Sequence, residues 1–140
     1  MGVFMSEQNK IVVQRFNQYV IAEGSREAFD VLVADRFINR SAPEGTAGDR
    51  ESLWRTFDQI LRPALTNLQV NIEDQIAERD WVTTRKTITG RHTGELMGVA
   101  PTGKAVNISV IDMVRIAEGK YVEHWGLNTL AQVLSQLKQN

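Results

Sequence analysis

Apolar residues in the N-terminal part of the chain recur at helical spacing. Over residues 7–22 they lie one, three and four positions apart, which predicts a helix with one buried stripe and Ser6 as its N-cap. Gly24 is suited to end this helix, and Ser25 to cap a second, antiparallel helix that reaches Ala34. Two short helices are therefore expected at the start of the fold.

A loop and a third helix are expected next. Residues 35–48 combine a short apolar piece with one proline and two glycines, which indicates an extended segment followed by a loop. Asp49 is placed to cap a helix whose apolar stripe runs to Leu61, and Pro63 marks the end of that helix.

From residue 68 onward the pattern alternates between apolar and polar positions, which is typical of strands. Strands separated by turns are predicted over the ranges 68–76, 81–92, 104–117 and 121–128. A final helix is predicted from residue 130. Helices followed by a run of strands indicate an α+β fold rather than alternating βαβ units, and we interpret the whole chain, residues 1–140, as one domain. A curved antiparallel sheet wrapped around the helices would leave a concave face suited to a pocket.

The composition is that of an ordinary folded domain. Hydrophobic residues make up 42% and charged residues 24% of the 140 positions, unlike the composition of disordered or fibrous chains. The formal net charge is −1 and no block of like charges occurs. Neither nucleic acid nor a membrane surface is therefore expected as a partner.

The N-terminus and the cysteine content bear on the cellular compartment. Residues 1–5 are too short for a signal peptide and are expected to be a disordered lead-in, with Met5 as an alternative start. No apolar run reaches the ~18 residues of a membrane span. The sequence contains no cysteine, so no disulfide or thiolate site can form, which fits a cytoplasmic protein.

Asp112 is the most informative single residue. The even positions of the predicted strand 104–117 share one face, and the other five from 106 to 116 are valine or isoleucine. Because burial disfavours an ionised carboxylate, the pKa of Asp112 is expected to rise toward neutrality, which would suit a general base or acid. The alternative is a structural Asp that is paired with a neighbouring strand or exposed by a shifted register.

His92 and His124 are the two histidines of the chain. His92 ends a predicted strand on the face of Val82, Thr84 and Ile88, where a neutral imidazole could orient a carbonyl or protonate an oxyanion; it could equally be hydrogen-bonded to loop backbone. His124 could line the pocket or play a structural part.

Arg85 and Lys86 flank the centre of the same strand, so one of them must point inward if the strand is central. A buried Arg85 could pair with Asp112 or with an anionic group of the substrate, whereas a solvent-facing arginine is the commoner outcome. Trp54, Phe57 and Trp125 could line a pocket for a flat hydrophobic ligand, although such residues also form cores.

Metal and cofactor sites are not expected. The two histidines are far apart in the sequence and no cysteine accompanies them. The glycines of the loop 98–103 lack the spacing of a phosphate-binding loop and no helix follows them.

Several segments resemble the SnoaL-like polyketide cyclase family. The segments that carry the resemblance are His92-Thr-Gly-Glu-Leu-Met-Gly98, Pro101-Thr-Gly-Lys104, Asp112-Met-Val-Arg115, Glu118-Gly-Lys120, Val122-Glu-His-Trp125 and, nearer the N-terminus, Phe37-Ile-Asn-Arg-Ser41. Their order and spacing span most of the C-terminal half. The sequence departs from the family pattern at Arg40, Thr66-Asn67 and Asn128.

The resemblance implies the α+β cone of the nuclear-transport-factor-two superfamily, in which helices and a highly curved, mainly antiparallel sheet enclose a deep pocket. It also implies a homodimer or homotetramer and ring closure by an intramolecular aldol reaction on a small hydrophobic carbonyl compound, without metal or cofactor. Asp112 matches the acid/base aspartate of the family, and His92 and Asn39 fall at pocket positions that would hold the carbonyl. Two other classes of function stay open: a binding module that has lost catalysis, and an oligomerisation domain.

Overall fold

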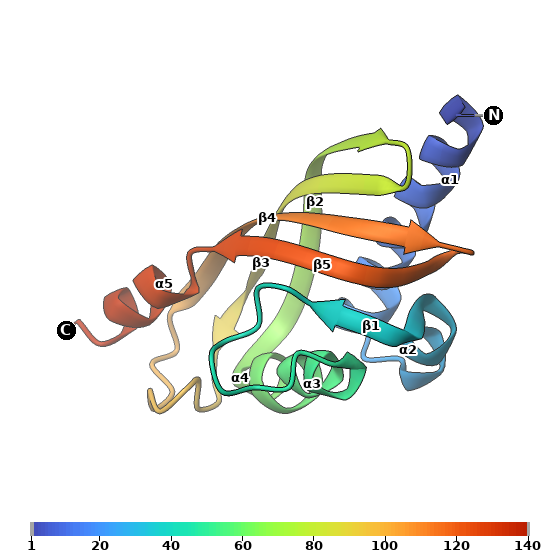
Figure 1. The fold of residues 1–140 in the computed structure, drawn as a ribbon. Helices are drawn as coiled ribbons and strands as arrows, with labels where there is room; N and C mark the ends of the chain where they lie inside the picture. Colours follow the sequence, from blue (N-terminus) through green and yellow to red (C-terminus); the bar gives the residue numbers. More distant parts are fainter. Residues whose placement is uncertain (1, 140) are drawn as a thin grey trace.

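The structure is a computed structural model that describes residues 2–139. Helices precede most of the strands, which confirms the predicted α+β class (Figure 1). The helical segments are α1 (Gly2–Arg15), the π-helical η1 (Phe16–Ala22), α2 (Arg26–Leu32), α3 (Arg50–Arg55), the π-helical η2 (Thr56–Leu61), α4 (Arg62–Ala64) and α5 (Leu130–Leu137). The strands are β1 (Val33–Asn39), β2 (Leu65–Glu78), β3 (Trp81–His92), β4 (Ala105–Ala117) and β5 (Lys120–Asn128).

The helix caps follow the sequence with one exception. The Ser25 side chain accepts the backbone N–H of Ala28, and the Asp49 side chain accepts that of Ser52, as expected for two N-caps. The first helix, however, begins at Gly2, so Ser6 lies inside it and the prediction of a disordered lead-in is wrong for residues 2–5. No glycine or proline interrupts the helical run after Gly2. Met1 lies outside the described residues.

The five strands form one curved, open sheet in the order β1-β5-β4-β3-β2 (Figure 1). Adjacent strands from β2 to β5 pair antiparallel, as predicted, while β1 pairs parallel with β5. The sheet is therefore mixed. The parallel edge brings Asn39, at the end of β1, beside His124 of β5.

Two hydrophobic clusters lie on the inner face of the sheet. One gathers helical residues such as Phe29 against Val82 and Val114, and the other gathers Leu96 with Ile88 and neighbouring residues. The alternation predicted for β4 is confirmed, because its even positions are all buried or partly buried. Along these strands, the inner face therefore supplies both the packed core and the walls of any cavity.

Among the described residues, none of the helices combines the length and the apolar character that crossing a bilayer requires. α5 follows the last strand and lies far from the start of α1 in Figure 1.

Candidate active site

A cavity of about 290 Å³ lies between the helices and the inner face of the sheet. Its walls draw on both hydrophobic clusters, for example Phe16 and Leu53 from one and Ile88 and Ile108 from the other. Most of the lining is apolar. The polar side chains in the wall are Asn39, Ser41, Thr56, Lys86, Asp112, Tyr121, His124 and Asn128.

Asp112 lies in the wall of this cavity and is 6% exposed. Its Oδ2 is 3.4 Å from Nζ of Lys86 and 3.4 Å from Nε2 of His124. Its Oδ1 is buried and has no hydrogen-bond partner among residues 2–139. One oxygen of the carboxylate is thus held by two basic groups, whereas the other is unpaired.

The pKa of Asp112 is lower than that of an ordinary aspartate, which contradicts the predicted rise. Burial by itself raises this pKa, but the positive charge of Lys86 and the hydrogen bond and charge of His124 lower it by more. Asp112 is consequently ionised at neutral pH. The predicted rise assumed an unpaired carboxylate, whereas the structure matches the alternative of an aspartate paired with a neighbouring strand, because Lys86 of β3 lies beside it.

Lys86 is itself buried, with 5% of its surface exposed. Its Nζ donates a hydrogen bond of 2.6 Å to Oδ1 of Asn17 in η1. The amide nitrogen of Asn17 in turn donates to the carbonyl oxygen of Val13, which fixes the direction of the amide. The cation is therefore held from the helical side as well as from the sheet.

His124 is oriented by a second chain of hydrogen bonds. Oδ1 of Asn39 accepts the backbone N–H of Ser41 and lies 2.9 Å from Nδ1 of His124. Because this oxygen is an acceptor, Nδ1 must be the donor. When Nε2 of His124 also carries a proton, the charged imidazole attracts the carboxylate of Asp112.

Gly126 leaves room for the imidazole of His124. Gly126 pairs with Asp112 across the strands, and a Cβ at this position would come within 2.9 Å of the His124 ring.

Tyr121 adds a neutral hydroxyl group to the cavity wall. Burial raises its pKa well above the usual value, and the negative charge of Asp112 raises it further. Its ring stacks on Phe16 with 4.3 Å between the ring centroids, which fixes its plane. Tyr121 therefore remains protonated at neutral pH.

His92 lies outside the cavity lining, so the predicted catalytic role does not fit its position. The alternation along β3 correctly predicted that His92 points to the inner face, because its ring is fully buried. However, His92 lies eight residues along β3 from Thr84, the cross-strand partner of Asp112, and is not among the residues that line the cavity. That separation corresponds to about 26 Å of strand. The backbone N–H of Thr102 donates to Nδ1 of His92 at 3.2 Å, which matches the alternative of a histidine bonded to loop backbone.

Three of the other predicted site residues also lie outside the cavity lining. Arg85 is exposed and binds Asp74 with an N–O distance of 2.6 Å. Trp54 packs against Phe29, and Trp125 is 48% exposed. The side chains of Arg85 and Trp125 belong to the outer face of the sheet, and Trp54 belongs to the helical layer.

Phe57, Asn39 and His124 do line the cavity, as predicted. Arg40 binds Glu123 at 3.0 Å, and Oδ1 of Asn128, also in the cavity wall, accepts the backbone N–H of Leu130.

Sequence reasoning missed Asn17 and did not select Lys86. The signal for Lys86 was present, because the even positions of β3 include it together with Val82 and Ile88. No comparable signal marks Asn17, which follows Phe16 on a helix and reaches Lys86 only through the tertiary fold.

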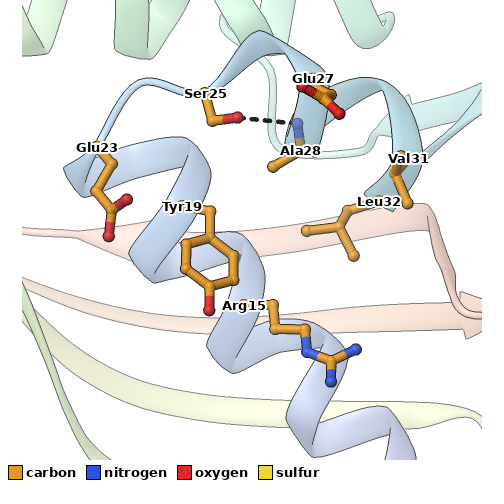
Figure 2. Close-up of a pocket in the computed structure, with 8 residues that line it drawn as sticks. All are labelled: Arg15, Tyr19, Glu23, Ser25, Glu27, Ala28, Val31 and Leu32. Atoms are coloured by element: carbon orange, nitrogen blue, oxygen red, sulfur yellow. Dashed lines mark hydrogen bonds between the residues drawn. The ribbon is translucent and has the colours of Figure 1, made fainter.

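A second hollow, of about 370 Å³, lies against α1, η1 and α2 (Figure 2). It is lined by Arg15, Tyr19, Glu23, Ser25, Glu27, Ala28, Val31 and Leu32. The hydroxyl group of Ser25 is engaged in the helix cap, as the dashed line in Figure 2 shows. Unlike the cavity at Asp112, this hollow is not lined by a buried charged side chain.

The model of the SnoaL-like polyketide cyclase family matches residues 11–137, a range that includes every side chain of the Asp112 cavity. The chain belongs to this family. Among characterised relatives, a segment of 56 residues is 38% identical to the aklanonic acid methyl ester cyclase AcmA of Streptomyces galilaeus. That segment spans 40% of this chain and 37% of the length of AcmA.

Solved structures agree with a SnoaL-like fold. A protein from Jannaschia sp. CCS1, proposed to be a SnoaL-like polyketide cyclase, superposes with a TM-score of 0.84 over 97% of this chain and 95% of that chain, at 21% identity. AclR of Streptomyces galilaeus, proposed to be a hydroxylase, gives a TM-score of 0.77 over 94% of this chain and 96% of that chain, at 26% identity. The SnoaL-like fold is thus shown, and the family supports a cyclase-type role.

Proposed function

We propose that this protein is a cofactor-independent acid/base enzyme that closes a ring in a small hydrophobic carbonyl compound by an intramolecular aldol reaction. The observation that supports this most directly is the carboxylate of Asp112, which lies in the wall of a largely apolar cavity and whose Oδ1 has no partner among the described residues. Membership of the SnoaL-like family and the likeness to AcmA support the same reaction class.

The proposed reaction begins with transfer of a proton from carbon to Asp112. A carbon between two carbonyl groups is acidic enough for an ionised carboxylate to act as the base when the proton is within reach. The resulting enolate carbon attacks a second carbonyl carbon of the same molecule, which forms a C–C bond and an alkoxide. Asp112 returns its proton to the alkoxide, so the product is an isomer of the substrate and no atom is lost.

His124 and Asn39 are assigned to orientation at this carboxylate. Asn39 fixes Nδ1 of His124 through a 2.9 Å contact, and Nε2 then faces Oδ2 of Asp112. This arrangement holds Oδ2 between the two basic groups, while Oδ1 has no hydrogen-bond partner among the described residues.

The apolar wall would contribute by folding the substrate. Side chains such as Phe57, Ile60 and Val110 provide contacts for hydrocarbon, and a confined cavity brings the enolate carbon and the second carbonyl together. A cavity of about 290 Å³ suits the reacting part of a small polyketide-like compound.

The test uses Asp112→Asn, with Asp74→Asn as the matched control on the outer face. Aklanonic acid methyl ester, from the name of the relative AcmA, is the first substrate to incubate, followed by simpler 1,3-dicarbonyl ketones. We expect wild-type protein and Asp74→Asn to form an isomer separable by chromatography, and Asp112→Asn to lose at least about 100-fold in kcat. Full turnover by Asp112→Asn would reject the proposal.

Two other outcomes are chemically distinct. AclR, proposed to be a hydroxylase, shares the fold and 26% of aligned residues, so the second candidate reaction is hydroxylation by molecular oxygen and an added two-electron reductant, with the second oxygen atom released as water. Mass spectrometry of the product separates an isomer from an oxygenated compound. Saturable binding with recovery of unchanged compound would instead identify a binding module.

We further propose that the protein works in the cytoplasm as a homodimer or homotetramer. The lack of cysteine supports the compartment. Support for self-association comes from the outer face of the sheet, where Ile111, Met113, Trp125 and Leu127 are exposed next to one another.

A further inference from the structure

The ammonium group of Lys86 has more donors than the described residues satisfy. It carries three protons, and one of them is used in the hydrogen bond to Asn17. The contact with Oδ2 of Asp112, at 3.4 Å, is an ion pair of longer range. Lys86 lines the cavity and is only 5% exposed, so bulk water can accept few of the remaining hydrogen bonds of its ammonium group. A buried ammonium group with unused N–H donors destabilises the folded state unless a hydrogen-bond acceptor is present. We expect that acceptor to be a group bound in the cavity.

We infer that Lys86 is a second catalytic residue, which binds the oxygen of the substrate enolate formed when Asp112 accepts the proton. This inference rests on the proposed function and adds to it the cation that binds the negatively charged oxygen of the enolate.

Charge conservation in the cavity supports this role. Before proton transfer the wall holds a positive Lys86 and a negative Asp112. After transfer Asp112 is neutral and the negative charge lies on the enolate oxygen, so the number of buried charges is unchanged. Lys86 exchanges one anionic partner for another, and the site needs no further solvation of the new charge.

The lowered pKa of Asp112 makes such a partner necessary. Lys86 and His124 keep the carboxylate ionised but also make it a weaker base. Proton transfer to a weak base proceeds only if the enolate is stabilised as well. The same cation that lowers the basicity of Asp112 is placed to supply that stabilisation.

Asn17 is a positioning residue in this scheme. Its Oδ1 accepts from Lys86 and its Nδ2 donates to the carbonyl oxygen of Val13, and neither bond depends on the charge of Asp112. Lys86 therefore stays in place when Asp112 becomes protonated. The residue lies in η1, and π-helical turns are often found where a side chain is directed into a site.

A binding experiment tests the inference separately from turnover. The probe is 2-acetylcyclohexane-1,3-dione, an enolised 1,3-dicarbonyl compound that is anionic at neutral pH, and the uncharged control is cyclohexyl methyl ketone. Asp112→Asn, which resembles the protonated aspartate, is compared with the double variant Asp112→Asn/Lys86→Met. The double variant contains neither buried charge of the pair and is therefore expected to fold.

We expect the Asp112→Asn variant to bind the anion more tightly than wild-type protein does, because repulsion by the carboxylate is removed. Adding Lys86→Met should weaken binding of the anion by about 10- to 100-fold, the value of a charge-assisted hydrogen bond, and leave binding of the uncharged ketone unchanged. In wild-type protein, calorimetry in buffers of different ionisation enthalpy should show uptake of one proton with the anion.

Equal affinity of the two variants for the anion would overturn the inference. That result would leave ring closure standing, because ring closure is judged by the turnover of wild-type protein against Asp112→Asn. Conversely, loss of anion binding in the double variant supports a role for Lys86 even if the substrates tried for turnover fail. In the turnover assay itself, Asn17→Leu should lower kcat more than it raises KM, and Asn17→Gln should recover part of the loss.

Discussion

Lys86 and Asp112 face each other diagonally across two central strands, with Nζ 3.4 Å from Oδ2. The cross-strand partner of Asp112 is Thr84, and Lys86 is two residues further along β3 on the same buried face. Both side chains are almost fully removed from solvent. The pair thus places a base and a cation side by side in a cavity wall.

Lys86→Met should destabilise the protein at neutral pH by about 3–5 kcal/mol, because it leaves a buried carboxylate without its cation. In wild-type protein the lowered pKa of Asp112 means that its contribution to stability is present above the ordinary carboxyl pKa and is lost as pH falls through the lower folded value. In the variant, burial without Lys86 raises that pKa, so stability should decrease as pH rises. Urea unfolding at pH 5 and pH 7 measures the difference.

The matched control for this experiment is Arg85→Met, which breaks the exposed pair with Asp74 and should change the unfolding free energy by about 0–1 kcal/mol. Identical free energies of unfolding for Lys86→Met and wild-type protein at both pH values would show that the ion pair of Lys86 and Asp112 does not contribute to stability.

Asn39→Ala should lower kcat by roughly 10-fold, the effect of losing one orienting hydrogen bond to His124. The same geometry requires a hydrogen on Nδ1 of His124 in wild-type protein. Nitrogen-15 NMR of the imidazole reports this directly. A spectrum with an unprotonated Nδ1 would contradict the assigned hydrogen-bond direction.

His92→Leu should leave turnover unchanged and reduce the free energy of unfolding by about 1–3 kcal/mol, because the fully buried imidazole and its hydrogen bond from the backbone N–H of Thr102 are both lost. Thermal unfolding and a turnover assay on the same sample distinguish this structural role from catalysis. Loss of turnover in a variant as stable as wild type would restore the catalytic assignment.

Ile111→Lys should shift the proposed homodimer or homotetramer toward monomer. Ile111 is 54% exposed and pairs with Leu127 across the strands, so a lysine places a charge in the centre of the apolar outer face. Sedimentation velocity measures the oligomeric state. Ile76→Lys, at an exposed position of the edge strand β2, is the control, and a monomeric wild-type protein would refute the proposed assembly.

Much of the fold could be predicted from local patterns. Helix caps at Ser25 and Asp49 and the alternation in β4 depend on residues close in the sequence, and the structure confirms them. The parallel pairing of β1 with β5 could not be predicted in this way, because it joins segments more than 80 residues apart. The position of Asn39 beside His124 follows from that pairing.

The sequence by itself determined that an acidic side chain, Asp112, occupies an otherwise apolar strand face, because alternation along one strand is a local property. Tertiary structure alone decided what surrounds that carboxylate. It placed His124 rather than His92 beside Asp112 and added Asn17 from a helix. A pKa depends on charges within a few ångströms in space, so the direction of its shift at Asp112 was set by strand register and helix packing, which no single segment specifies.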